Sequence, residues 1–260
     1  MVTQNGIELI NRLRKEEFNI ATEKKLECHP YVIAAEEGKL TPAQQRAFVI
    51  EQYHIQKSDA TSFALLAGHP RFTPPTLATA TVPQHPPPAA DAEKKTTSHD
   101  PDLFQFLLGG EIYAAPMLLR YAKSLELDED ALRAAARTLN PLSQAYPSYW
   151  ARMALNGQRA AGAAACAVNF PAWGSMCARV HAALSRREEY GYGRDGDCCD
   201  DALDFIKFFG TPIENLDDMA AAVIDEVEGG VEYEDLVTAV RLLQEYEVMF
   251  WDAVYGAGKE

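Results

Sequence analysis

The chain has 260 residues, 47% of them hydrophobic and 24% charged, which is enough for one large domain with a real core. Its formal net charge of −14 argues against nucleic-acid binding, because phosphate contacts need clustered cations, and against an anionic membrane surface. No apolar run approaches the ~20 residues of a membrane span. Five cysteines without framework spacing fit a reducing compartment, so we predict a cytoplasmic protein.

The first predicted elements are helices. Residues 7–37 carry apolar side chains at helical spacing, with a break expected at His29-Pro30, since the residue before a proline is disfavoured in a helix. The residues TPAQ at 41–44 match a capping box with proline at the first helical position. They predict the start of a long, mostly buried helix that ends at Gly68.

Residues 70–101 have a different composition. Eight prolines punctuate this polar stretch, which is rich in alanine and threonine. Proline at that density is incompatible with helices and sheet ladders. We predict a flexible surface insertion between two helices, within a single domain that spans residues 1–260.

Helical patterning resumes after the insertion. It predicts elements over residues 102–126, 129–139, 146–155, 158–184, 200–209 and 232–255. Thr211, Pro212 and Glu214 repeat the capping-box pattern and predict one more helix, ending at Gly229. Since no run alternates polar and apolar residues between turn signals, the predicted fold class is an all-α bundle.

The last predicted helix carries the sequence YEVMFWDAVY at residues 246–255. It resembles the C-terminal signature Tyr-Glu-x-x-Phe-Trp-Asp-x-Ala-Tyr of the TenA/thiaminase II group, which belongs to the haem-oxygenase-like superfamily. Segments at 38–52, 145–150 and 205–210 resemble further family motifs in the same order. Together these segments cover most of the chain outside the insertion.

The resemblance implies a helical bundle around a central pocket. It also implies cleavage or salvage of thiamin-type pyrimidines by a cysteine nucleophile, supported by carboxylates and tyrosines. A small heteroaromatic molecule is therefore the expected partner, without a cofactor. A homodimer or homotetramer is a further expectation from the resemblance.

Individual positions agree with the family in part. Glu247 stands at the position of the catalytic glutamate, and Tyr146 at a tyrosine that lines the pocket. Tyr53 stands where an aspartate is expected, and Phe209 replaces another pocket tyrosine. The Leu-Pro-Cys-x-Trp-x-Tyr motif falls on residues NFPAWGS at 169–175, which retain the tryptophan as Trp173 and have a proline where the cysteine belongs.

That proline, Pro171, bears directly on mechanism. Displacement at a pyrimidine methylene needs a thiolate and a base, and proline supplies neither. Cys166 and Cys177 lie five residues before and six after it, so at about 100° per residue both point roughly 120–140° away from Pro171. The sequence therefore predicts that the usual cysteine mechanism is lost.

Glu247 is the leading candidate for a pocket acid. It lies on a helix otherwise built from Tyr246, Met249, Phe250 and Trp251, where a buried carboxylate is costly unless paired. Burial would raise its pKa and let it bind a ring nitrogen or amino group. The alternative is a glutamate on the solvated side of the helix. The residues predicted to surround the ligand are Tyr146, Tyr53, Trp173, Phe209 and Glu51.

Three alternatives stay open. Glu51 and His54 form one half of a di-iron motif, and Glu111 and Asp195 would have to complete a non-haem oxidase site. No second Glu-x-x-His pair follows, so a solvated or hydrogen-bonded pair is expected and no metal site is predicted. His29 is similar in position to the proximal histidine of haem oxygenases, but a His-Pro step also ends a helix. A non-catalytic scaffold with a closed interior is the third alternative.

Overall fold

The computed structural model describes residues 5–68, 102–187, 190, 201–227 and 229–258. The predicted insertion at 70–101 and most of the predicted loop at 190–196 lie outside these ranges. All regular secondary structure within them is helical, which confirms the all-α class. The helices are α1 (Gly6–Leu13), α2 (Glu17–Glu27), α3 (Pro30–Glu36), α4 (Pro42–Leu66), α5 (Leu103–Ser124), α6 (Glu129–Ala134) followed by the 3₁₀ turn η1 (Ala135–Arg137), α7 (Pro141–Leu155), α8 (Arg159–Leu184), α9 (Asp204–Phe209), α10 (Leu216–Asp225) and α11 (Tyr233–Gly256).

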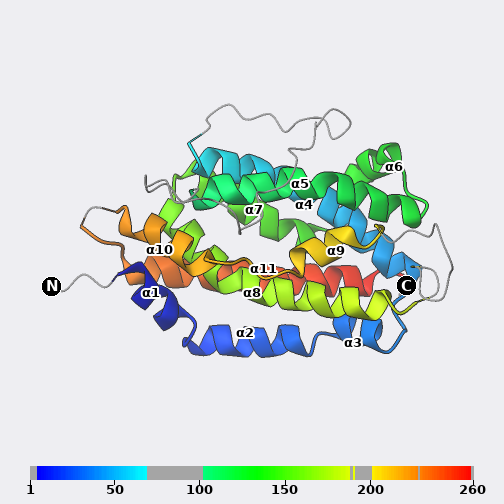
Figure 1. The fold of residues 1–260 in the computed structure, drawn as a ribbon, viewed down its shortest axis with the longest axis horizontal. Helices are drawn as coiled ribbons and strands as arrows, with labels where there is room; N and C mark the ends of the chain where they lie inside the picture. The colour runs from blue at the N-terminus through cyan, green and yellow to red at the C-terminus, as the bar shows by residue number, and fades with distance from the viewer. Residues whose placement is uncertain (1–4, 69–101, 188–189, 191–200, 228, 259–260) are drawn as a thin grey trace, which may run out of the picture.

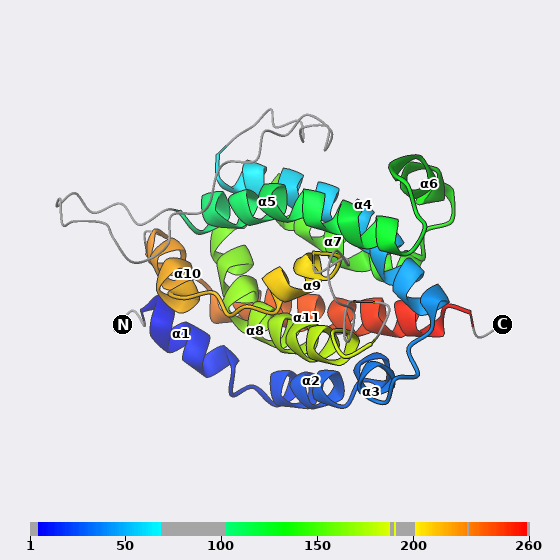
Figure 2. The same cartoon turned by 45° about the vertical axis from the view of Figure 1, so that its right-hand side comes forward.

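Two long helices form the centre of the bundle. Helices α8 and α11 run side by side through its middle, with α1, α2 and α3 along one edge and α4 and α5 on the opposite side (Figure 1, Figure 2). Helix α7 packs against both α4 and α11 and so joins the two sides. Among the described residues, no helix combines the length and hydropathy needed to cross a membrane.

Local capping sets several helix starts as predicted. At the start of α4, the Thr41 hydroxyl accepts from the Gln44 backbone N–H at 3.2 Å, and the Gln44 side chain accepts from the Thr41 N–H at 3.0 Å. His29 caps α3, because its Nδ1 accepts from the Tyr31 N–H at 3.2 Å. Its Nε2 lies 3.2 Å from a carboxylate oxygen of Asp252. These contacts agree with the interpretation of His29-Pro30 as a helix boundary.

The start of α7 differs from the prediction. The helix begins at Pro141, five residues before the expected position, with Asn140 as its N-cap. The Asn140 side chain accepts from the Leu142 N–H at 2.9 Å. Proline at the first helical position costs no hydrogen bond, so the Asn-Pro pair is a start signal that the sequence analysis missed.

The predicted capping box at residues 211–214 is wrong. Helix α10 begins at Leu216, and its N-cap Asn215 makes no side-chain cap bond. Asn215 adopts the left-handed conformation, with φ of 58°, which asparagine tolerates better than most residues. The chain therefore turns sharply at Asn215 before the helix can start.

Two hydrophobic clusters stabilise the bundle. The first lies around the N-terminal half of α8 and includes Phe63, Phe104 and Trp150. The second lies around the C-terminal halves of α8 and α11 and includes Phe48 and Trp251. In the first cluster the alanine-rich start of α8 allows close packing.

Gly6 is buried where α1 packs closely against α10. A Cβ at Gly6 would lie 2.6 Å from the backbone of Ala221, so α1 could not keep its contact with α10. We expect Gly6→Ala to lower the free energy of unfolding by about 1–3 kcal/mol through overpacking. The measurement is chemical denaturation followed by circular dichroism.

Gly109 provides the matched control. It lies within α5, is exposed, and a Cβ there would meet no atom within 4 Å. Gly109→Ala should raise the free energy of unfolding by about 0.5–1 kcal/mol, because alanine loses less conformational freedom in a helix. Equal effects of the two substitutions would contradict the packing of α1 on α10.

Candidate functional site

A layer of polar side chains crosses the bundle between the two hydrophobic clusters. On α8, for example, the first cluster extends to Val168 and the second begins at Met176; on α11 the corresponding residues are Leu243 and Phe250. The polar layer consists of the buried residues Gln56 and Asp59 of α4, Asn169 of α8, and Gln244 and Glu247 of α11, together with the half-buried Glu111 of α5 and Tyr146 of α7. Burying several polar groups at one level is costly, which makes this layer the candidate site.

Glu247 lies inside the layer, with an exposed fraction of 1%. Its Oε2 accepts a hydrogen bond from the Asn169 side-chain amide, and its Oε1 accepts one from the Trp251 indole N–H at 3.2 Å. Burial raises the pKa of Glu247 to about 7, against the opposing effect of the two hydrogen bonds. The expectation of an interior carboxyl is confirmed, and a group with this pKa can donate or accept a proton near neutral pH.

Asn169 organises the polar groups around that carboxyl. Its Nδ2 also donates to the Gln244 side-chain oxygen at 2.8 Å, while its Oδ1 accepts from the Tyr146 hydroxyl at 3.0 Å. Gln244 in turn donates to Asn19 of α2 at 2.5 Å. All the hydrogen-bonding groups of the Asn169 side chain thereby have partners, which fixes its orientation and that of Glu247.

The indole of Trp251 connects Glu247 to a cluster of aromatic rings. The Trp251 ring centroid lies 5.2 Å from that of Trp173 and 5.8 Å from that of Phe48. Trp173 makes an edge-to-face contact with Phe209 at 6.2 Å. The predicted residues Trp173 and Phe209 therefore belong to the aromatic cluster that Trp251 links to Glu247.

Two predicted site residues have other partners. Both carboxylate oxygens of Glu51 accept hydrogen bonds at the start of α7, from the Asn140 backbone N–H at 2.8 Å and the Gln144 side chain at 2.6 Å. The hydroxyl of Tyr53 donates to Glu129 of α6 at 3.3 Å. The structure thus gives Glu51 an anchoring role and directs Tyr53 toward α6, away from the polar layer.

The metal hypothesis gains no support from the described residues. His54 contacts the backbone carbonyl of Leu132 at 2.9 Å, whereas Glu51 bonds residues at the start of α7, so the two side chains have separate partners. Within the ranges that the structure describes, no three His, Cys, Asp or Glu residues are placed to hold a metal ion. Asp195, which that hypothesis required, lies outside these ranges.

The two cysteines of α8 face the interior of the bundle. Pro171, at the position predicted for the nucleophile, is exposed on α8, as is Ser175. Cys166 and Cys177, which point away from Pro171, are both fully buried. Because Pro171 lies on the exposed face of α8, side chains that point away from it point into the bundle. Both thiols therefore remain candidates for a role in the interior site.

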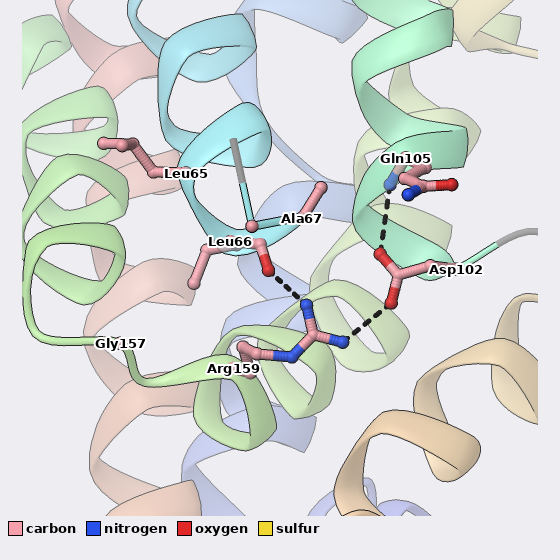
Figure 3. Close-up of a pocket in the computed structure, with 8 residues that line it drawn as sticks. Leu65, Leu66, Ala67, Asp102, Gln105, Gly157 and Arg159 are labelled. Carbon is pink, nitrogen blue, oxygen red and sulfur yellow. Dashed lines mark hydrogen bonds and ion pairs between the residues drawn. The ribbon is translucent and has the colours of Figure 1, made fainter. Parts of the chain in front are cut away.

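An open hollow on the surface, with a volume of about 450 Å³, lies where helix ends meet (Figure 3). It is lined by Leu65, Leu66, Ala67, Gly68, Asp102, Gln105, Gly157 and Arg159. The Arg159 guanidinium donates to the Leu66 carbonyl and to Asp102 at 2.7 Å, and it also bonds Glu226 at 3.1 Å. Its charge is therefore balanced by two carboxylates, and we interpret the hollow as a joint between α4, α5 and α8.

Comparisons with known proteins agree with this architecture. Residues 89–257, more than half of the chain, match the TENA/THI-4/PQQC family. The chain belongs to this family. No curated protein matches the chain.

Solved structures of TenA homologues share the fold of this family member. One, from Pseudomonas syringae pv. tomato, superposes with a TM-score of 0.65 at 12% identity, covering 94% of this chain and 91% of the other. A second, from P. horikoshii, gives 0.63 at 14% identity, covering 96% and 99%. At such identities the likeness establishes the TenA-like, haem-oxygenase-like fold and no more.

The raised pKa of Glu247 predicts a pH-dependent stability for this TenA family member. A carboxyl whose pKa rises from 4.5 to about 7 on folding stabilises the fold fully below pH 4.5 and loses that contribution as the pH rises through 7. The difference in unfolding free energy between wild type and Glu247→Gln should therefore change by roughly 3 kcal/mol over that window. Chemical denaturation at a series of pH values measures it.

Glu245→Gln is the control for that series. Glu245 is exposed on the same helix, where it pairs with Arg241 at 3.1 Å. At each pH, the free energy of unfolding of the variant is subtracted from that of wild type. This removes the contribution of buried His29, whose lowered pKa makes stability rise with pH, opposite to the effect of Glu247. A pH-independent difference for Glu247→Gln would contradict the desolvated carboxyl.

Proposed function

We propose that this TenA family member binds a small, flat heteroaromatic base of the aminopyrimidine or thiamin type in the polar layer of its bundle. The observation that carries the proposal is the Glu247 carboxyl, held inside the protein by Asn169 and Trp251. If this carboxyl had only a structural role, an apolar side chain of similar size would make the fold more stable. A ligand with a ring nitrogen and an amino group would use it as both donor and acceptor.

The neighbouring side chains suit such a ligand. A carboxyl with a pKa near neutrality can donate to a ring nitrogen when protonated, or accept from an amino group when ionised. The rings of Trp173 and Phe209 are linked to this carboxyl through Trp251, and flat heteroaromatic ligands pack on such aromatic faces. Tyr146 completes the set through its bond to Asn169.

Titration calorimetry with 4-amino-2-methylpyrimidine and with thiamin tests the proposal. We expect wild type to bind at least one of them, and Glu247→Gln to bind about 10- to 100-fold more weakly, because it loses an ionisable hydrogen-bonding group. Glu245→Gln should bind like wild type. Tyr146→Phe, which keeps the ring and removes one hydrogen bond, provides a milder variant of the same site.

Two results would count against this function. One is the absence of heat from either compound with folded wild type. The other is equal affinity for wild type and Glu247→Gln, with circular dichroism confirming that the variant is folded.

A second candidate function, thiol-dependent cleavage of the ligand, is favoured by one observation. Cys177 is fully buried on the inner side of α8, and the charge of Glu247, after burial itself, raises the pKa of its thiol. A thiol with a raised pKa is a weak nucleophile by itself, so attack on the ligand would require Glu247 to take up the thiol proton as the thiolate forms. We propose Cys177, rather than the residue at position 171, as the nucleophile if cleavage occurs.

Release of the thiazole from thiamin, followed by chromatography, tests the second candidate. We expect Cys177→Ser to reduce the rate at least 100-fold. Cys166→Ser, which removes the other buried thiol of α8, should retain most of it. Equal rates for wild type and Cys177→Ser would exclude Cys177 as nucleophile and leave the binding function intact.

A further inference from the structure

The other end of the polar layer holds a second carboxyl that the proposed function does not use. Asp59 of α4 is 5% exposed, and its Oδ1 is fully buried without a hydrogen-bond partner among the described residues. Trp150, 0% exposed, lies at the same end of the layer, and its indole interacts with the Tyr146 side chain. Buried polar atoms in folded proteins are satisfied in the great majority of cases, so the unpartnered oxygen of Asp59 marks a place that recognises something.

A second acid lies beside Asp59. Glu111 of α5 is the charged group that acts most strongly on Asp59, and Gln56 holds the two helices in register by donating to the Glu111 backbone carbonyl at 3.1 Å. The charge of Asp59 also raises the pKa values of two further titratable groups, Tyr146 of α7 and Cys166 of α8. Neither carries a positive charge.

The packing between α4 and α7 places Trp150 at this end. Phe63, one helical turn after Asp59, packs edge-to-face on the Trp150 ring with a centroid distance of 5.1 Å. Tyr146 lies one turn before Trp150 on the same face of α7. Asp59, Tyr146 and Trp150 therefore lie at neighbouring levels of the same helix interface.

We propose that Asp59 and Glu111, with Trp150 beside them, form a subsite for a small organic cation, an ammonium or amidinium group. Two neighbouring carboxyls on which no described cation acts cannot both ionise without repelling each other, and an N–H-rich cation removes that obstacle. The ring of Trp150 adds a face for cation–π contact. This inference deepens the proposed function and rests on it, because it gives the ligand of the interior site a positively charged end.

The proposal has a proton signature. Burial and the mutual effect of the two acids raise the pKa of Asp59, and burial raises that of Glu111 to about 8. Near neutral pH Glu111 is therefore largely protonated in the free protein, and Asp59 keeps its proton to a higher pH than a solvated aspartate. An arriving cation must displace a proton from them, so binding should release protons and strengthen as the pH rises, as long as the amine stays charged.

Calorimetry with benzylamine and benzamidine, and with benzyl alcohol as the neutral isostere of benzylamine, tests the subsite. Titrations near neutral pH in phosphate and in Tris, whose ionisation enthalpies differ, measure the protons released. We expect the two cations to bind at least 10-fold more tightly than the alcohol, with proton release for the cations alone. Asp59→Asn should abolish that preference, whereas Asp218→Asn, an exposed aspartate of α10, should keep it.

Thermal unfolding separates this role from a structural one. A recognition carboxyl should cost stability in the free protein, so Asp59→Asn is expected to melt at the same temperature as wild type or higher. If that variant does not fold, Glu111→Gln takes its place in the titrations. Equal binding of benzylamine and benzyl alcohol, or cation binding unaffected by these substitutions, would overturn the subsite.

The cation subsite and the proposed pyrimidine site can fail independently of each other in these experiments. Pyrimidine binding that depends on Glu247, without any preference for cations, overturns the Asp59 subsite alone. Failure of the pyrimidines, together with cation binding that depends on Asp59, removes the aminopyrimidine assignment and keeps the subsite.

Discussion

The hydrogen bonds that Asn169 and Trp251 donate to Glu247 are the contacts on which the interior of this protein depends. They come from α8 and α11, the two helices at the centre of the bundle (Figure 1). Without them a carboxyl at 1% exposure would have no compensation for its lost hydration. The two hydrophobic clusters can lie on either side of this level because the polar groups there satisfy one another.

That arrangement relates stability to function. A bundle of this size could be more stable with apolar side chains through its middle, since a buried polar network stabilises less than packed hydrocarbon. The layer instead carries one carboxyl with a pKa near 7 and a second acid pair at its other end. Such groups bind polar small molecules well, which is the role proposed here for this layer.

Much of the fold was accessible from sequence because its signals are local. The capping box of α4 lies within four residues, and Glu247 is conspicuous as a carboxylate on an apolar helix. The start of α7 also has a local signal in Asn140 and Pro141, but its anchoring by Glu51 of α4 comes from a different helix, and no local pattern shows it. Asp59 follows other polar residues on α4, so no periodicity marks it as interior. Whether Pro171 faces the interior or solvent depends on how α8 is rotated about its axis in the bundle. A motif match does not give that rotation.

The most direct test is a carbon-13 NMR titration of the Glu247 side-chain carboxyl in protein labelled at glutamate, with Glu247→Gln used for assignment. The account predicts a midpoint near 7, well above the 4.5 of a solvated glutamate. A midpoint at the solvated value would show that this carboxyl faces water and would contradict the interior site.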